Sequence, residues 1–115
     1  MIRGIGTDIV EIERIKPGLI KKILSEPELV IYNSFGSETR KAEFLAGRFA
    51  VKEAISKALS HLDHPLSLPD MIVLNDDNGK PYLICDKVKD LRFLISISHE
   101  RQFAVGFCIV ETIDL

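Results

Sequence analysis

Tryptophan is absent from the 115 residues, and cysteine and methionine occur only twice each. Cys85 and Cys108 make no disulfide framework and match no zinc-ligand spacing. Both lie in apolar, strand-like contexts, so we expect buried core thiols. No apolar run approaches the roughly 20 residues of a membrane-spanning helix, and Arg3 and Asp8 interrupt the start of the chain, where a signal peptide would be apolar. We therefore expect the cytoplasm as the compartment.

A strong net charge is also missing. Lys and Arg number 15 and Asp and Glu 17, for a formal charge of −2, which argues against general nucleic-acid binding. The charge is nevertheless uneven, because four basic residues follow one another with no acid between them. Such a stretch is either a solvated helix face or a docking surface for an acidic macromolecule. It comprises Arg14, Lys16, Lys21 and Lys22.

Hydrophobic residues make up 46% and charged residues 28%, which is typical of a globular protein. Together with the length, this predicts one domain over residues 1–115. Apolar periodicity predicts a shorter helix over 12–25, opened or broken by Pro17, and a long helix over about 38–60 with Ser37 as its N-cap. Residues 25–36 are predicted to be rich in turns. The apolar stripe of the long helix comprises Phe44, Val51, Ile55, Ala58 and Leu62.

Short strands are expected elsewhere, where apolar residues alternate with polar ones or follow turn residues. The fold class predicted is α+β: a mostly antiparallel sheet packed by one long helix and a shorter N-terminal helix. An Asp-Asp-Asn-Gly turn at 76–79 indicates a hairpin. The expected strands are residues 1–8, 71–75, 82–85, 94–98 and 103–109, the last two joined by a tight polar turn.

Two acids stand out by their place in these elements. Asp8 ends an apolar strand, and Glu53 lies within the long helix between Lys52 and Lys57. Magnesium is commonly held by one or two carboxylates together with substrate phosphates, which these acids could provide. A mid-helix glutamate is more often plain surface charge. Lys57, four residues after Glu53, fits either a weak i,i+4 ion pair or a cation aimed at a phosphate.

Further candidates are a histidine and two basic residues. His99 follows alternating serines at the tip of a strand, a place that favours a site, although a lone histidine is more often incidental. Arg48 and Lys52 lie one helical turn apart. They form either a phosphate-binding patch or a solvated face.

At these positions the chain resembles the holo-[acyl-carrier-protein] synthase family, the short bacterial phosphopantetheinyl transferases. Four blocks carry the resemblance, in the family's order and at its spacing over nearly the whole chain. Each block alone is modest support, and the four together are specific. They are residues 4–12 (GIGTDIVEI), 44–58 (FLAGRFAVKEAISKA), 95–99 (ISISH) and, more weakly, 78–82 (NGKPY).

The resemblance implies the phosphopantetheinyl transferase fold and its reaction. The 4′-phosphopantetheine arm of coenzyme A would be transferred to a serine of apo acyl carrier protein, for fatty acid biosynthesis, leaving adenosine 3′,5′-bisphosphate. Magnesium would be the cofactor, and the assembly would be a homotrimer with active sites between subunits. No nucleic acid or membrane would take part.

The resemblance also implies roles for single residues. Asp8 and Glu53 would hold magnesium and, with Lys57, form the catalytic group. The acceptor of the serine proton stays open between Asp8, Glu53 and a metal-bound water. Arg14 and Lys21 would belong to the helix that docks the acidic carrier protein. The residues that would hold coenzyme A are Lys57, Arg48, His99 and Arg40.

One segment departs from the family pattern. Residues 60–64 (SHLDH) stand where many relatives have a glycine-rich turn, which puts a coenzyme contact from this loop in doubt. His61 and His64 lack a third ligand, so we expect surface residues. Two other classes compete with the transferase: a nucleotide-binding module, which would not need Asp8 and Glu53 at one metal, and a magnesium-dependent phosphohydrolase, which would consume coenzyme A without a carrier.

Overall fold

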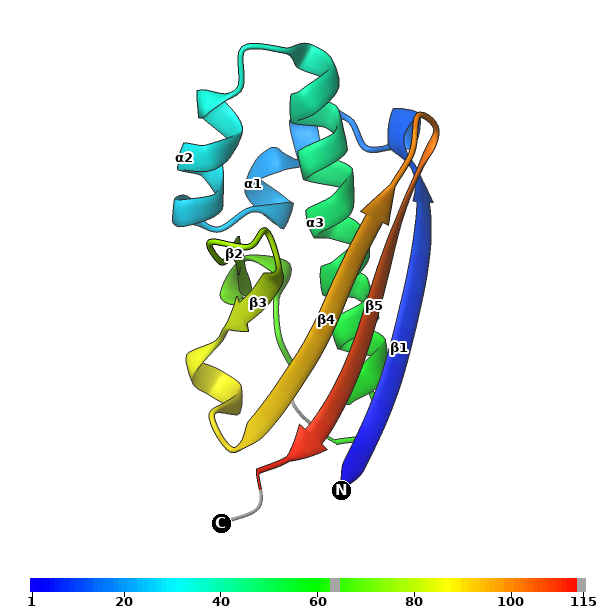
Figure 1. Cartoon of the computed structure of the whole chain (residues 1–115), viewed down its shortest axis with the longest axis vertical. Helices are drawn as coiled ribbons and strands as arrows, with labels where there is room; N and C mark the ends of the chain where they lie inside the picture. Colours follow the sequence, from blue (N-terminus) through cyan, green and yellow to red (C-terminus); the bar gives the residue numbers. More distant parts are fainter. Residues whose placement is uncertain (63–64, 114–115) are drawn as a thin grey trace.

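The chain forms an α+β fold, as predicted, in a computed structural model that describes residues 1–62 and 65–113. An antiparallel sheet has the strand order β1-β5-β4. The long helix α3 (Glu38–Leu59) lies along one face of that sheet, and a separate two-stranded hairpin lies beside β4 (Figure 1). The strands are β1 (Ile2–Glu11), β4 (Leu91–His99) and β5 (Phe103–Thr112) in the sheet, and β2 (Ile72–Asn75) and β3 (Pro81–Ile84) in the hairpin.

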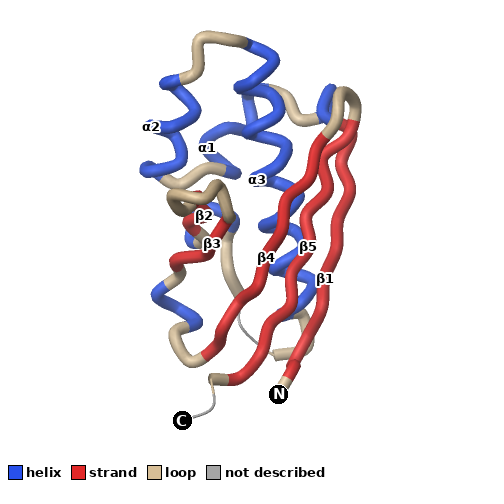
Figure 2. The backbone as a smooth tube through the Cα atoms, in the orientation of Figure 1, coloured by secondary structure: helices blue, strands red, loops and turns tan. Residues whose placement is uncertain are grey.

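The three long strands bury one face and expose the other. In β5, Ala104 and Cys108 are fully buried, whereas Phe103 and Phe107 stay exposed on the opposite side. This period of two is what a half-covered antiparallel strand requires. All five predicted strands are confirmed, and β1, β4 and β5 are longer than expected. Figure 2 shows the helical segments gathered on one side of the three-stranded sheet.

Glycines let α3 rest directly on the strands. A Cβ atom at Gly6 would lie 2.0 Å from the carbonyl oxygen of Ala54, and one at Gly106 would lie 2.4 Å from the backbone of Val51. No side chain fits into such a gap. The close approach fixes the height of the helix above β1 and β5.

The core forms between α3 and the sheet. Val51, Ile55 and Ala58 of the predicted stripe are fully buried, while Phe44 and Leu62 are half-buried. Ser37 caps the helix as expected, since its side chain accepts a hydrogen bond from the Arg40 amide at 3.3 Å. Cys108 is buried as predicted. Cys85 is only half-buried, packed against the same core.

The helix expected over 12–25 is wrong. The segment consists of 3₁₀ turns over Ile12–Arg14 and Pro17–Leu19, followed by the short helix α1 (Ile20–Ile23). Proline has no amide hydrogen and forces the residue before it into an extended conformation. Lys16 has that conformation, so the chain bends there instead of continuing as one helix.

The turn-rich stretch expected over 25–36 is also wrong, because most of it is the helix α2 (Glu26–Ser34). Ser25 and Glu28 form a capping box at its start, and Pro27 occupies the first turn. Ser25 and Glu28 satisfy free backbone amides of the helix N-terminus, and Pro27 has no amide hydrogen to satisfy. No helix in the described residues is long and apolar enough to cross a membrane.

Candidate active site

A lysine–carboxylate pair joins α3 to the middle of β1. Gly4, Gly6 and Asp8 are alternate residues of β1 on the face that packs against α3. Lys57 extends from the last turn of α3 toward this strand. The Lys57 Nζ donates to Asp8 Oδ1 at 2.9 Å and to the Thr7 carbonyl oxygen at 3.0 Å. The Asp8 side chain is 17% exposed and that of Lys57 56%, so a cation and an acid stand at an accessible edge.

Glu53 lies one helical turn before Lys57 and is half-buried. The β1 backbone at Gly6 touches α3 at Ala54, which places position 53 close to the strand that carries Asp8. Glu53 makes no hydrogen bond or ion pair with any described residue, so both of its oxygens are open to a ligand. Among the described residues, no three His, Cys, Asp or Glu side chains gather in one place. A cation bound at this edge of the sheet would therefore have two protein carboxylates available, those of Asp8 and Glu53.

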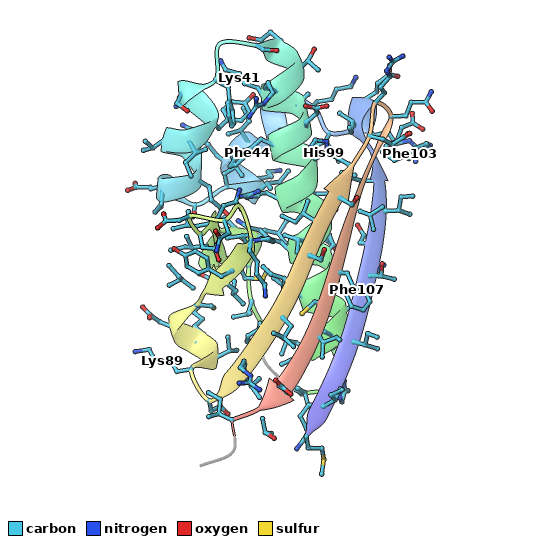
Figure 3. All side chains as sticks on the ribbon, in the orientation of Figure 1. Lys41, Phe44, Lys89, His99, Phe103 and Phe107 are labelled. Carbon is cyan, nitrogen blue, oxygen red and sulfur yellow. The ribbon has the colours of Figure 1, made fainter. Side chains whose placement is uncertain are left out.

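A cavity of about 460 Å³ opens on the other side of α3. Its walls come from α2, α3, both strands of the hairpin and the end of β4. Figure 3 shows Phe44 on α3 facing α2, and His99 at the end of β4 beside α3. The charged and aromatic groups in the wall are Phe35, Arg40, Glu43, Phe44, Arg48, Tyr82 and His99.

Arg48 is the most constrained cation of this cavity. Its Nε donates to the Val73 carbonyl oxygen and its Nη2 to Asn75 Oδ1, both at 3.2 Å. The guanidinium stacks 4.3 Å from the centre of the Phe44 ring. Burial lowers the pKa of Arg48, and the Glu28 carboxylate opposes that shift. The group stays a cation at any physiological pH, aimed into a cavity whose wall it forms.

Arg40 and His99 stand nearer the mouth of the cavity. Arg40 is exposed and stacks 4.9 Å from the centre of the Phe35 ring. His99 Nδ1 lies 3.7 Å from a Glu43 carboxylate oxygen, a contact that becomes an ion pair when the ring is protonated. Arg40, Arg48 and His99, three of the four residues that the resemblance implied for coenzyme A, therefore line one cavity, and Lys57 does not.

Lys52 does not have either of the two roles that the sequence suggested. It belongs neither to a phosphate patch nor to a solvated face, because its side chain is completely buried. Its Nζ pairs with the carboxylate of Glu28 and donates to the Ile23 carbonyl oxygen at 2.7 Å. Burial lowers the pKa of Lys52, and the Glu28 carboxylate counteracts this. The paired acid compensates for the buried charge.

The two groups of predicted residues lie at opposite edges of the sheet. Asp8 is on β1 and His99 is on β4, with β5 between them. Asp8, Glu53 and Lys57 are absent from the wall of the cavity that holds Arg48 and His99. One chain thus carries two separated half-sites.

The basic stretch lies apart from both half-sites along the chain. All four residues are exposed: Arg14 lies on the first 3₁₀ turn, Lys16 just before the second, and Lys21 and Lys22 on α1. Residues 60–64, which differ from the family pattern, contain two histidines that were expected at the surface. His61 is exposed as expected, with Nε2 2.6 Å from the Arg3 carbonyl oxygen. His64 lies outside the described residues.

Sequence reasoning missed several residues of the cavity. Glu43, Asn75 and Tyr82 line it, and Glu28 stands behind it. For Glu28 the signal was present, since a serine three residues before a glutamate is a capping pattern. Asn75 and Tyr82 come to the cavity only through the three-dimensional placement of the hairpin, which also brings Asn75 to Arg48.

The cavity is lined by two arginines that stack on aromatic rings, the buried Arg48 and the exposed Arg40, and two carboxylates and a lysine lie at the opposite edge of the sheet. This is the chemistry of a protein that binds phosphate esters. A family model described as the 4′-phosphopantetheinyl transferase superfamily matches residues 4–108. The chain therefore belongs to the 4′-phosphopantetheinyl transferase superfamily.

Individual relatives support the same family assignment. The chain is 45% identical over 121 residues to the holo-[acyl-carrier-protein] synthase of Geobacillus sp. strain WCH70, covering 99% of this chain and 100% of that protein. It is 42% identical to that of Bacillus subtilis strain 168, covering 99% of each. It superposes with a TM-score of 0.86 on the crystal structure of a holo-(acyl-carrier-protein) synthase from Bacillus anthracis str. Ames in complex with CoA (3′,5′-ADP), at 41% identity and covering 98% of this chain and 99% of that one.

Proposed function

We infer that this chain is a holo-[acyl-carrier-protein] synthase, one phosphopantetheinyl transferase domain over residues 1–115. It transfers the 4′-phosphopantetheine arm of coenzyme A to a serine hydroxyl of apo acyl carrier protein, the activation step for fatty acid biosynthesis. Its near full-length similarity to proteins of that name supports this. We assign it to the cytoplasm, as expected from the sequence.

The observation that carries the proposal is the Asp8–Lys57 contact one helical turn from Glu53. In the reaction the serine oxygen bonds to the β-phosphorus of coenzyme A, and the bond from that phosphorus to the bridging oxygen breaks. Adenosine 3′,5′-bisphosphate leaves with the electron pair. Lys57 stabilises the charge that grows on the phosphate oxygens, because a fixed cation costs no reorganisation at that moment.

Magnesium is the cofactor of this proposal, and the residues present fit it. Asp8 and Glu53 are hard oxygen donors at an accessible edge, and magnesium takes one or two carboxylates with substrate phosphates and water. When bound it would neutralise charge on the diphosphate. A carboxylate committed to the metal is a poor base, so the serine proton would pass to a water held by one of these two acids.

The opposite half-site would bind the nucleotide end of coenzyme A. Arg48 and Arg40 line the cavity and match anionic phosphates in charge, and His99 lines it beside them, where its ring can donate a hydrogen bond. Arg48 is held from behind by Val73 and Asn75, so it is pre-organised before the ligand arrives.

A homotrimer would bring the two half-sites together. The outer face of the three-stranded sheet exposes Ile5 and Ile9, each 64%, together with Phe103 and Phe107, each 37%. A contiguous apolar face of this kind marks an interaction surface. If a second copy covers it, the carboxylate edge of one subunit can face the cavity of the next. We propose this arrangement, closed by rotational symmetry.

The basic stretch would dock the carrier protein. Arg14 and Lys21 are exposed, and opposite charges across an interface steer association.

Mass spectrometry of apo acyl carrier protein tests the proposal. After incubation with the protein, coenzyme A and magnesium, the carrier is expected to gain the mass of one phosphopantetheine group, and EDTA is expected to prevent the gain. An unmodified carrier with intact coenzyme A would favour a binding module. An unmodified carrier with cleaved coenzyme A would favour a phosphohydrolase.

A further inference from the structure

The carboxylate of Glu28 is fully occupied inside the protein. Its Oε1 accepts hydrogen bonds from the Ser25 amide and the Ser25 hydroxyl, both at 2.8 Å, and pairs with Lys52. Its Oε2 accepts a bond from the Val73 amide at 2.8 Å. Glu28 is the only buried carboxylate among the residues that the structure describes. It therefore joins α2, β2 and α3 at one point.

Two buried cations compete for this single acid. Arg48 is one helical turn before Lys52, is 5% exposed, and feels the attraction of the same carboxylate. Lys52 holds the acid, whereas both hydrogen-bond partners of Arg48 among the described residues are neutral, the Val73 carbonyl and the Asn75 amide oxygen. Val73 is bonded to both side chains: its amide donates to Glu28 and its carbonyl oxygen accepts from Arg48. The cluster as a whole carries one uncompensated positive charge.

We propose that Lys52 is a positioning residue for coenzyme binding: by holding the buried Glu28 carboxylate, it keeps the guanidinium of Arg48 free of any carboxylate partner and open to an anion in the cavity. This rests on the proposed function, in which Arg48 contacts phosphates of coenzyme A.

The physical reason is the competition between two anions for one guanidinium. Arginine and a carboxylate form a strong, often bidentate pair, as do arginine and a phosphate. An acid buried without its lysine is costly and must find another cation or a proton. Arg48 is the other buried cation within the described residues. Once paired with Glu28, it would bind a phosphate less well.

The test compares two variants by calorimetric titration with coenzyme A in the presence of magnesium. Lys52→Met removes the ammonium and keeps the shape, and we expect coenzyme A to bind about tenfold more weakly, the scale of one hydrogen bond to a charged group. The double variant Glu28→Gln/Lys52→Met also removes the competing acid. We expect its affinity to return to within about twofold of the unmodified protein, since neutral replacements of buried pairs are tolerated.

A purely structural role for the pair predicts a different pattern. Both variants would then bind coenzyme A equally weakly, and that result would overturn the proposal, as would an unchanged affinity in Lys52→Met. Melting temperatures separate folding from binding, because they can fall in both variants while the affinity recovers in only one. If Lys52→Met does not fold, the double variant decides: retained affinity supports the proposal, and lost affinity contradicts it.

Arg48→Ala serves as the reference. Weaker coenzyme A binding in this variant is expected. Unchanged binding would contradict the phosphate role of Arg48 in the proposed function, and with it the present inference. Loss in Arg48→Ala and Lys52→Met without recovery in the double variant would leave the proposed function standing and overturn the role of Lys52 alone.

Discussion

The Lys57 ammonium lies 2.9 Å from the Asp8 carboxylate and 3.0 Å from the Thr7 carbonyl oxygen, so the last turn of α3 is tied to the middle of β1. Both groups reach solvent, and exposed ion pairs contribute little to stability, below about 1 kcal/mol. The contact therefore serves the site more than the fold.

Lys57→Met separates these two contributions. We expect turnover to fall about 100-fold, because a fixed cation at the developing phosphate charge is lost. The melting temperature should stay close to that of the unmodified protein. Steady-state kinetics and a thermal scan measure both; a large drop in melting temperature with unchanged turnover would show the pair to be structural.

Glu53→Gln tests the carboxylate edge. The change keeps the shape of the side chain and removes its charge, so we expect turnover to fall about 1,000-fold or more while the circular dichroism spectrum is unchanged. Glu38→Gln, at the exposed start of the same helix, is the matched control and should retain activity. Normal turnover of Glu53→Gln with magnesium present would rule out its role as a metal ligand.

Reversing charge in the basic stretch should affect only the carrier. We expect Arg14→Glu/Lys21→Glu to raise the KM for acyl carrier protein about tenfold and to weaken its dependence on salt. The KM for coenzyme A should not change. Lys89→Glu, at the opposite end of the molecule in Figure 3, is a control with a single charge reversal. An unchanged carrier KM would place the docking surface elsewhere.

Separated half-sites predict complementation between inactive variants. Glu53→Gln retains the cavity and Arg48→Ala retains the carboxylate edge, so a trimer that contains both variants would rebuild about a third of its sites. Co-expression with two different affinity tags, followed by tandem purification and a transfer assay, measures this. If activity stays at the level of the separate variants, both half-sites must act within one chain.

The two thiols should differ in reactivity. Burial raises the pKa of Cys108 to about 12 from an ordinary value of 9.0, and the thiolate is the reactive form. A thiol reagent at pH 8 should therefore label half-buried Cys85 first and Cys108 only on unfolding. Because the folded pKa is the higher one, the stability contribution of Cys108 is complete below pH 9 and is lost as the pH rises toward 12. Urea unfolding across this range, compared with Cys108→Ala, checks the sign; equal losses in both proteins would contradict it.

Local sequence patterns predicted much of the fold. The long helix, its Ser37 cap and the strands followed from periodicity and turn residues. The pairing of Lys57 with Asp8 was not predicted, since spacing along the helix suggested Glu53 as its partner. The helix α2 was missed although Ser25, Pro27 and Glu28 carry start signals, because its apolar residues are clustered and lack a clear helical period.

Burial of charge was beyond the reach of local patterns. A lysine within a helix is usually solvated, and only the arrival of Glu28 from another element makes the interior tolerable for Lys52. The separation of the half-sites likewise depends on strand order, since β1 and β4 become opposite edges only when β5 inserts between them.

At Gly6 and Gly106 the backbone of α3 contacts the backbone of the sheet directly, with no side chain between them. Even one methyl group at either position would push α3 off the strands, and with it the residues on its last turns. We expect every substitution at these two positions to disturb the packing of α3, whereas exposed positions accept many residues. In a saturation library selected for carrier activation, we therefore expect these two codons to return as glycine while the surface around them varies.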